Sequence, residues 1–309
     1  MSFPTGRNNL SAYPSGMAGK PNRGIDHLVL CVRHLEAARR TDARLGFTLT
    51  PHAVHPWGTG NSLAQFRGNF IELLTIDDPA KITPAAAREF SFGAAADRFL
   101  KRREGCSMIA LATDDARRDR DEFAAAGLGT YAPFDFARQA RLPDGREATV
   151  AFSLAFATDA RLPELTFFTC QHRAPEFFWR PEYQRHANGA TTIEEILIAA
   201  DDPPSLADLF ARLEGEDAVS AQGGRLEVAT ARGRLTVLGR EAAAERCPGL
   251  PLPAAPESAH IIGCRIAVSD LDAVKMRFDA SDVTYRAMSG AVQIAPDIAC
   301  GMYLELAAP

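Results

Sequence analysis

The chain has 309 residues, of which 46% are hydrophobic and 24% are charged, a profile typical of a globular protein with one large or two ordinary domains. The net charge of -5 and the lack of any lysine- or arginine-rich block argue against a nucleic-acid-binding surface. Residues 1–23 are rich in Gly, Pro, Ser and Asn and contain no apolar run. We therefore expect a flexible tail there, with no signal peptide and no membrane anchor.

The six cysteines form no C-x-x-C pair. Four of them lie in or beside apolar, strand-like runs, where a thiol behaves as a small hydrophobe; these are Cys31, Cys106, Cys170 and Cys264. This usage predicts a reducing compartment, most simply the cytoplasm.

Residues 24–76 form the first structural unit that the sequence predicts. An apolar run over 25–32 predicts a strand, the spacing over 35–45 predicts a helix, and three strands follow, the last at 70–74. His27 lies in the first strand and Glu72 in the last, each among apolar residues. An ionisable group in a buried strand costs free energy unless it has a partner. We therefore expect the two side chains to lie side by side and to hold a divalent metal.

The same order of elements, strand, helix and three strands, recurs three more times. In the second unit, strands are expected at 106–112, 130–136, 146–156 and 164–170, with a helix at 114–126 closed by Gly127. In the third, they are expected at 192–198, 218–222, 225–229 and 234–238, with a helix at 204–213. In the fourth, they are expected at 260–268, 283–286, 291–294 and 302–306, with a helix capped by Asp270.

These units predict two domains, joined by an ordered linker at 172–189 that is rich in proline and aromatic residues. Domain 1 spans 24–171, with units at 24–76 and 105–171, and domain 2 spans 190–309, with units at 190–240 and 259–309. A second linker, 247–256, is Pro-rich and is expected to be extended.

Several segments resemble the glyoxalase-like branch of the vicinal oxygen chelate superfamily, which includes glyoxalase I, extradiol dioxygenases and bleomycin-resistance proteins. They are Asp26-His27-Leu28-Val29, Leu45-Gly46-Phe47, Gly58-Thr59-Gly60-Asn61, Phe70-Ile71-Glu72-Leu73-Leu74, and residues 170–173, 179–180 and 186–189. The resemblance implies an α+β fold of four βαβββ units. These would form two tandem domains, each with a curved, incompletely closed mixed sheet. The cup of such a sheet holds a divalent metal that substrate oxygens chelate.

In this superfamily, the metal ligands come from the first and fourth strands of paired units. Alignment of the first strands places three residues at the position of His27 in the later units, namely Met108, Glu195 and Gly263. The position of Glu72 becomes Thr166, Val237 or a neighbour, and Glu305. The first cup thus keeps one histidine and one glutamate, and the second offers only the two glutamates, Glu195 and Glu305.

His27 and Glu72 are the candidate catalytic residues and metal ligands, with Fe, Mn, Ni or Zn as the candidate metals. Without a metal, the pKa of a buried Glu72 would rise, and it could act as a general base at a carbon next to a carbonyl group. The alternative for His27 is a core histidine that bonds a backbone carbonyl. His172 is a candidate third ligand or substrate contact, and the alternative is a surface residue.

The remaining candidates for substrate binding are Trp57, Thr59, Asn61, Arg173, His186 and Asn188. Thr59 and Asn61 could hydrogen-bond a substrate carbonyl or carboxylate, or they could belong to an ordinary Gly-rich turn. Trp57 could form a wall of the cup or pack under its loop. Arg173 could clamp an anionic substrate, or it could be solvated.

The sequence therefore predicts a metal-dependent enzyme that acts on a small oxygenated molecule in the first cup, as a lyase, an isomerase or a dioxygenase. The alternative is a metal-free protein that sequesters a small molecule, as bleomycin-resistance proteins do. A scaffold whose cups are filled by side chains is the third interpretation. Whether units pair within one chain, or exchange between the chains of a homodimer, stays open.

Overall fold

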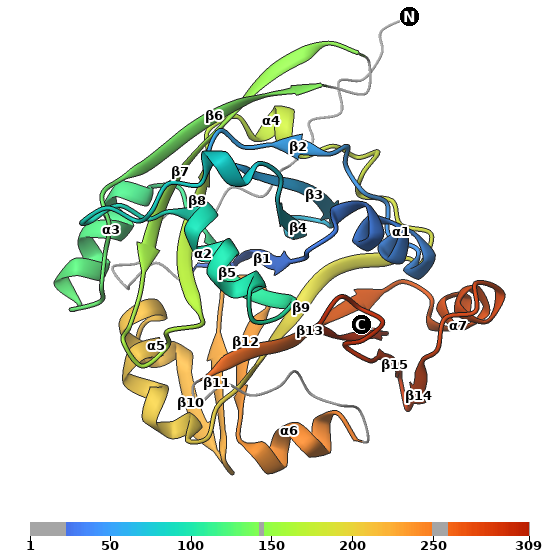
Figure 1. Ribbon diagram of the computed structural model, residues 1–309. Coiled ribbons are helices and arrows are strands. Elements are labelled where there is room, and N and C mark those ends of the chain that lie inside the picture. The colour runs from blue at the N-terminus through green and yellow to red at the C-terminus, as the bar shows by residue number, and fades with distance from the viewer. Residues whose placement is uncertain (1–22, 142–144, 249–258, 309) are drawn as a thin grey trace, which may run out of the picture.

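The computed structural model describes residues 23–141, 145–248 and 259–308. In these ranges the strands form two eight-stranded mixed sheets, with the orders β2-β3-β4-β1-β5-β8-β7-β6 and β10-β11-β12-β9-β13-β16-β15-β14. The first half of the chain builds one curled sheet and the second half builds the other (Figure 1). This confirms the predicted α+β fold with two tandem, incompletely closed sheets.

Each half contains two βαβββ units. The first unit comprises β1 (Ile25–Cys31), α1 (Leu35–Leu45), β2 (Ala53–Val54), β3 (Thr59–Gln65) and β4 (Phe70–Ile76). The second comprises β5 (Gly105–Ala112), α3 (Ala116–Ala125), β6 (Phe134–Arg141), β7 (Glu147–Ala157) and β8 (Thr166–His172). The third comprises β9 (Ala190–Ala199), α5 (Ala207–Glu214), β10 (Val219–Gln222), β11 (Arg225–Ala229) and β12 (Arg234–Leu238). The fourth comprises β13 (His260–Val268), α7 (Leu271–Ala280), β14 (Arg286–Met288), β15 (Ala291–Ile294) and β16 (Tyr303–Ala307).

The first strands of neighbouring units pair in the middle of each sheet. β1 runs parallel to β4 and antiparallel to β5, and β9 has the same relation to β12 and β13. The units therefore pair within the chain, the first with the second and the third with the fourth.

Two strands begin three or four residues later than the sequence predicts. β6 begins at Phe134 and not at Thr130, because Pro133 has no N–H to donate to a strand ladder. β14 begins at Arg286 and not at Val283. Its register follows from the tight turn before β15, which pairs Met288 with Ala291 and has Gly290 at a positive φ of 75°.

Within the described residues, three α-helices lie outside the predicted elements. They are α2 (Phe92–Leu100), α4 (Pro175–Phe178) within the linker, and α6 (Arg240–Arg246). Ser91 caps α2, and its apolar side, with Phe92, Ala96 and Phe99, packs on the concave face of the first sheet. Most of the linker predicted at 247–256 lies outside the described residues.

Each face of β1 belongs to a different core. Leu28 and Leu30 pack into a cluster that also contains Ile196 and Ile198 of β9, so this core is shared by both sheets. The intervening side chain of Val29 faces the concave side of the first sheet, which we call the first cup. The side chains along β1 therefore alternate between the joint of the two domains and the cup.

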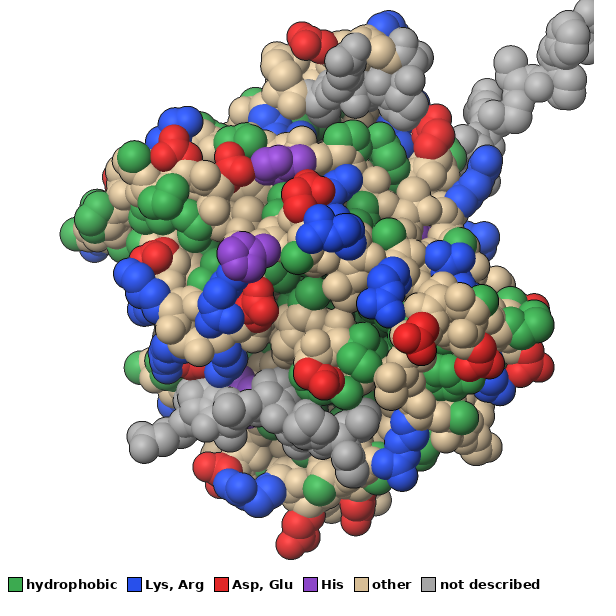
Figure 2. Space-filling model, turned by 45° about the vertical axis from the view of Figure 1, so that its right-hand side comes forward, with side chains coloured by type: hydrophobic (Ala, Val, Ile, Leu, Met, Phe, Trp, Pro, Cys, Tyr) green, Lys and Arg blue, Asp and Glu red, His purple; other side chains and the backbone are tan. Residues whose placement is uncertain are grey.

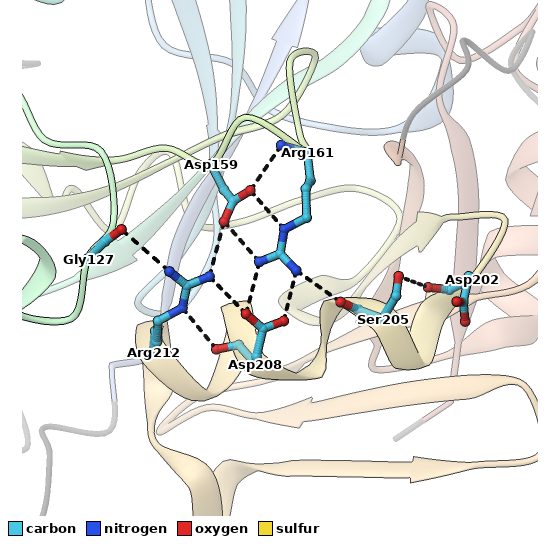
Figure 3. Close-up of polar contacts among 7 residues, drawn as sticks. All are labelled: Gly127, Asp159, Arg161, Asp202, Ser205, Asp208 and Arg212. Atoms are coloured by element: carbon cyan, nitrogen blue, oxygen red, sulfur yellow. Dashed lines mark hydrogen bonds and ion pairs between the residues drawn. The ribbon is translucent and has the colours of Figure 1, made fainter.

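Ion pairs also join the two halves. Arg161, after β7, lies 2.8 Å from Asp208 of α5, and Arg212 of α5 lies 3.1 Å from Asp159 (Figure 3). Arg23, the last residue of the predicted tail, is buried and lies 2.6 Å from Asp119 of α3. The other residues of that tail lie outside the described part of the chain.

The face of the molecule in Figure 2 carries lysine, arginine, aspartate and glutamate side chains in alternation, with apolar side chains between them. No helix in the described ranges has the length and apolar character needed to cross a membrane.

Candidate active site

An irregular register on β1 brings two polar side chains to the first cup. Between β1 and β5, Ile25 pairs with Leu111 and His27 pairs with Ala110, so Asp26 is an extra residue in the ladder. Such a β-bulge disturbs the alternation of side chains and can re-aim one of them. The side chains of Asp26 and His27, although adjacent in the chain, can therefore hydrogen-bond each other.

Asp26 bonds two imidazoles. Its Oδ2 lies 2.7 Å from Nδ1 of His27, and its Oδ1 lies 3.0 Å from Nε2 of His172. Burial raises the pKa of Asp26, but the interactions with His172 and His27 outweigh burial and hold this pKa well below its usual range. Because an ionised carboxylate only accepts hydrogen bonds, Nδ1 of His27 is a donor, and Nε2 is the ring nitrogen that carries the lone pair in the neutral imidazole.

Glu72 faces Nε2 of His27. Oε2 of Glu72 lies 3.7 Å from Nε2 of His27, and Oε1 accepts a hydrogen bond of 2.6 Å from Nδ2 of Asn61. The imidazole of His27 is stacked on Phe70, with ring centroids 4.3 Å apart. The histidine and the glutamate expected to lie side by side are thus together on one concave surface.

The polar chain continues from Asn61 to His55. Nε2 of His55 lies 3.4 Å from Nδ2 of Asn61, and Nδ1 lies 2.8 Å from the hydroxyl of Thr59. Burial lowers the pKa of His55 to about 3, so this imidazole is neutral at physiological pH. Trp57 stacks on His55, with ring centroids 4.8 Å apart.

These polar groups lie in a cavity with mainly aromatic walls. Its empty volume is about 540 Å³, including the space open to solvent at its mouth. Apart from His27, His55, Thr59, Asn61, Glu72 and Arg138, the lining consists of Trp57, Leu63, Phe70, Leu74, Phe92, Phe136, Phe152, Leu154, Phe168, Cys170 and Phe178. Burial and the nearby Asp26 raise the pKa of Cys170 well above its usual range, so its thiol is protonated. The first cup is therefore a mostly apolar chamber with one row of polar groups.

The structure brings some predicted site residues together and leaves others outside. His27, Trp57, Thr59, Asn61 and Glu72 line the cavity. His172 is not among its lining residues, and its Nε2 is bonded to Asp26. The side chain of Arg173 is exposed and donates to Ser153.

His186 and Asn188, predicted to bind substrate, lie away from the cavity lining. Nε2 of His186 is bonded to the carbonyl of Gln65, and its Nδ1 accepts from the N–H of Thr48. Asn188 is buried and donates to the carbonyl of Leu45 at the end of α1. Both side chains hydrogen-bond the backbone of the first domain and so attach the linker to it.

Three residues of the site were not predicted. Asp26 precedes the candidate histidine, and only the bulge explains its place in the cup. His55 lies between β2 and β3, outside both strands, so no strand periodicity indicates where its side chain points. Arg138 lies on β6, whose start was predicted too early. The alternation of Phe134, Phe136 and Arg138 was the available signal for the last of these.

The strand registers revise one predicted equivalence. Glu72 lies opposite Val29 of β1, and the residue in the matching place of the second unit is Phe168, opposite Ala110. Thr166 was predicted for this position but lies two residues earlier, because β8 begins at Thr166 and a turn still occupies Glu164.

The pair of His27 and Glu72 fits a divalent metal. Two ligand atoms 3.7 Å apart can share one ion, since zinc lies about 2.0–2.2 Å from nitrogen and oxygen ligands. One imidazole and one carboxylate suit Zn, Fe, Mn or Ni. Met108 and Phe168 at the other two positions offer no such ligand, so substrate and water would supply the remaining coordination.

A second group of candidate ligands lies beside this pair. Ligand atoms of Asp26, Cys170 and His172 lie within 4.8 Å of one another. Both oxygens of Asp26 already accept from imidazoles, and the thiol of Cys170 is protonated. The hydrogen bonds of this group therefore account for its arrangement.

In the second cup, the two glutamates at the ligand positions form ion pairs with an arginine. Glu195 and Glu305 are both buried, and Nη2 of Arg246 lies 3.0 Å from the first and 2.9 Å from the second. Thr236 and Arg234 also donate to Glu195, while Arg265, Gln293 and Tyr303 donate to Glu305. A guanidinium from α6 thus occupies the space between the two carboxylates.

The fold and the cup define a protein of the vicinal oxygen chelate type. The model of the glyoxalase-like domain matches residues 25–214, more than half of the chain, and the chain belongs to this family. The match covers the whole first domain, including His27 and Glu72. No curated protein matches the chain.

Solved structures share the fold at low sequence identity. A hypothetical protein from Staphylococcus aureus is similar with a TM-score of 0.65 and 12% identity, over 93% of this chain and 100% of that one. A mutant of 4-hydroxymandelate synthase from Streptomyces coelicolor is similar with a TM-score of 0.50 and 11% identity, over 94% of each chain. A fusion protein of a xylose isomerase-like TIM barrel and a 4-hydroxyphenylpyruvate dioxygenase has a TM-score of 0.50 and 13% identity, over 92% of this chain and 48% of that one.

Proposed function

We propose that the first cup is the active site of an enzyme that transfers a proton at a carbon next to a carbonyl group of a small molecule. A divalent metal would be held by His27 and Glu72. The observation that carries the proposal is the approach of Oε2 of Glu72 to Nε2 of His27, 3.7 Å apart inside an apolar cavity. Names of similar folds include a synthase and a dioxygenase, which supports an enzyme without indicating the reaction.

Glu72 is the proton acceptor in this proposal. Asn61 holds one carboxylate oxygen, so the other is directed toward the cavity with little rotational freedom. The aromatic walls exclude water, which strengthens the attraction between charges inside the cup. A carboxylate in such a place can take a proton from an acidified carbon and return it to a neighbouring atom, as a lyase or an isomerase requires.

Asp26 and His27 complete the site. Asp26 holds Nδ1 of His27 as the donor, so Nε2, which faces Glu72, is the nitrogen that would ligate a metal. When bound, a metal would polarise the substrate carbonyl as a Lewis acid. Iron, manganese, nickel and zinc are the candidates that the ligand types support. The six free cysteines support the expected reducing cytoplasm.

Metal titration tests the proposal. Apo protein titrated with Mn²⁺, Fe²⁺, Ni²⁺ or Zn²⁺ in a calorimeter should bind one ion per chain. His27→Ala and Glu72→Gln should abolish binding. His34→Ala, which removes an exposed histidine before α1, should leave binding unchanged. No binding of any of these ions, or equal binding by all variants, would contradict the metal site.

Proton transfer is measured separately. Loaded protein is incubated in D₂O with a panel of small 2-oxo and 2-hydroxy compounds, and NMR follows deuterium uptake at the carbon next to the oxygen-bearing group. At least one compound should exchange, and Glu72→Gln should slow the exchange by about 10²-fold or more. Absence of exchange across the panel would contradict the proton-transfer assignment.

A metal-free binding protein is the second candidate. The apolar residues at two ligand positions, Met108 and Phe168, favour it. In that case, the protein binds its ligand equally well after chelation and catalyses no exchange.

A further inference from the structure

Arg138 is a charged residue on the wall of the first cup that the proposed proton transfer does not use. It lies on β6, where Phe134, Phe136 and Arg138 alternate along one side of the strand. Phe136 and Arg138 both line the cavity, and Phe134 packs edge-on against Trp57. The strand therefore presents this guanidinium to the same space as Glu72.

Arg138 has no acceptor of its own. In the described ranges, its side chain makes no hydrogen bond and no ion pair within 4.0 Å. Burial lowers the pKa of Arg138, and Glu72 partly opposes this shift. A guanidinium stays charged in proteins and carries five N–H donors. Arg138 is half-buried, so a ligand that enters the cup can accept hydrogen bonds from N–H groups that bond no acceptor in the described residues.

Arg138 and Glu72 attract each other across the cavity but form no direct ion pair. One oxygen of Glu72 accepts from Asn61 and the other lies 3.7 Å from Nε2 of His27, so neither is bonded to Arg138. The carboxylate of Asp26 is engaged by hydrogen bonds to two imidazoles. With a divalent ion beside Glu72, the cavity would carry a net positive charge, which favours an anionic ligand.

Arg138 lies where the cavity meets a neighbouring groove, a position from which it would orient a bound anion. Leu63, Arg138 and Phe178 line both the inner cavity and an adjoining outer groove, so Arg138 lies where the two meet. The inner walls are the faces and edges of aromatic rings, which suit a flat apolar body.

We infer that the substrate of the first cup is an aromatic carboxylate, or an acid of similar shape, whose anionic group binds to Arg138 while its ring lies among the phenylalanines. The inference rests on the proposed function for the place of the reacting carbon. It adds the chemical class of the substrate and names Arg138 as its specificity-determining residue. A bidentate hydrogen bond between guanidinium and carboxylate would provide the discrimination.

Paired probes test the inference. Phenylacetate and 3-phenylpropanoate are compared with their primary amides, which have nearly the same shape but no charge, by calorimetry on the metal-free and the metal-loaded protein. The wild type should bind each acid about 10- to 100-fold more tightly than its amide, the range expected for a charged hydrogen bond. Arg138→Gln should abolish this preference, and Arg138→Lys should retain part of it.

Arg180→Gln is the matched control. Arg180 also lines the outer groove, but its Nη2 lies 3.6 Å from Glu182. This variant should keep the preference for acids. Equal binding of acid and amide by the wild type, an unchanged preference in Arg138→Gln, or its loss in Arg180→Gln would each overturn the inference. Circular dichroism checks that each variant is folded. If Arg138→Gln does not fold, the preference for acids is measured in Arg138→Lys instead.

Glu72→Gln separates the two proposals. It lacks the proposed base and metal ligand but keeps Arg138, so the preference for acids should persist. A wild type that prefers acids but catalyses no deuterium exchange would refute the proton transfer and leave the anion site standing. Deuterium exchange without any preference for acids would refute the anion site and leave the proton transfer standing.

Discussion

The two cups share one strand plan but satisfy their buried charges in different ways. In the first, His27 and Glu72 face each other across 3.7 Å with aromatic rings around them. In the second, Arg246 bridges Glu195 and Glu305, and further donors surround both carboxylates. In the second cup a cation bridges the two carboxylates, whereas in the first no arginine or lysine of the described residues forms an ion pair with Glu72. Unused polar groups in a cavity are typical of a site that a ligand completes.

The helices over the two cups produce this difference. The helix α2 lies on the first sheet with apolar residues such as Phe92 and Ala96, and it leaves the cavity open. The helix α6 packs Ala242 and Ala243 on the second sheet, and its last residue, Arg246, reaches between the glutamates. The short insertion before the fourth unit therefore places a cation between the two glutamates of the second cup, which still borders a hollow lined mainly by charged side chains.

Removing Arg246 should have the largest effect on stability. Arg246→Met removes the cation that Glu195 and Glu305 share. Each glutamate keeps one other arginine, so we expect a loss of about 3 kcal/mol, the lower end of the cost of breaking a buried ion pair. Urea denaturation at pH 7 measures the loss. Millimolar Mn²⁺ or Ca²⁺ should restore part of it, because the two glutamates then resemble an empty cation site.

Arg240→Met is the control for that experiment. Arg240 begins the same helix, but its side chain is 84% exposed, so its loss should change the free energy of unfolding by less than about 0.5 kcal/mol. Similar losses in both variants would mean that Arg246 is not the internal cation of the second cup.

A matched pair of glutamate variants compares the cups directly. Glu305→Gln weakens the bonds to Arg246 and Arg265 and should cost about 2–3 kcal/mol. Glu72→Gln removes a charge that has no ion pair with an arginine or lysine in the described residues, and it should change stability by less than about 1 kcal/mol. If denaturation shows Glu72→Gln to be as costly as Glu305→Gln, both carboxylates are structural and the contrast between the cups fails.

The pH dependence of stability should reveal His55 in the first cup. In the folded state its pKa is about 3, below its ordinary value of 6.5, because of burial. The unfolded chain therefore binds this proton first, and the free energy of unfolding falls as pH decreases from about 6.5 toward 3. At pH 5.5, this group should account for about 1 kcal/mol of the loss relative to pH 7.5.

Denaturation midpoints at the two pH values measure that contribution. His55→Phe should show a smaller loss between pH 7.5 and pH 5.5, whereas His34→Asn, at an exposed site, should follow the wild type. Parallel pH profiles for wild type and His55→Phe would mean that His55 is not the buried neutral group described above.

The sequence predicted the repeat because hydrophobic periodicity is local. The helix at Leu35–Leu45 and the strand at Arg225–Ala229 have the predicted bounds, and Asp270 caps α7 by accepting from two backbone N–H groups. The pairing of His27 with Glu72 was also accessible, since both follow from their places in the first and fourth strands. These features depend on the residue types in a single unit.

The parts that were missed depend on contacts between units. The bulge at Asp26 is a property of the β1–β5 ladder and has no signature in either strand alone. Arg246 reaches the second cup from a helix outside the repeat, and Arg138 reaches the first from a strand whose register the hairpin sets. His186 and Asn188 had the side chains of a binding site, yet the linker uses them to attach itself to the first domain.

The surface ion pairs between the domains should have the smallest effect. Arg161 is paired with Asp159 and Asp208, but its side chain is 39% exposed (Figure 3). Pairs at such sites typically contribute about 0–1 kcal/mol and are screened by salt. Arg161→Gln should therefore cost less than about 1 kcal/mol at low ionic strength and almost nothing at 1 M NaCl. The loss caused by Arg246→Met should persist in salt, since its partners are buried. If salt reduced the loss of stability caused by Arg246→Met, the ion pairs of the second cup would behave like exposed surface pairs. Arg246 could then not be described as the internal cation of that cup.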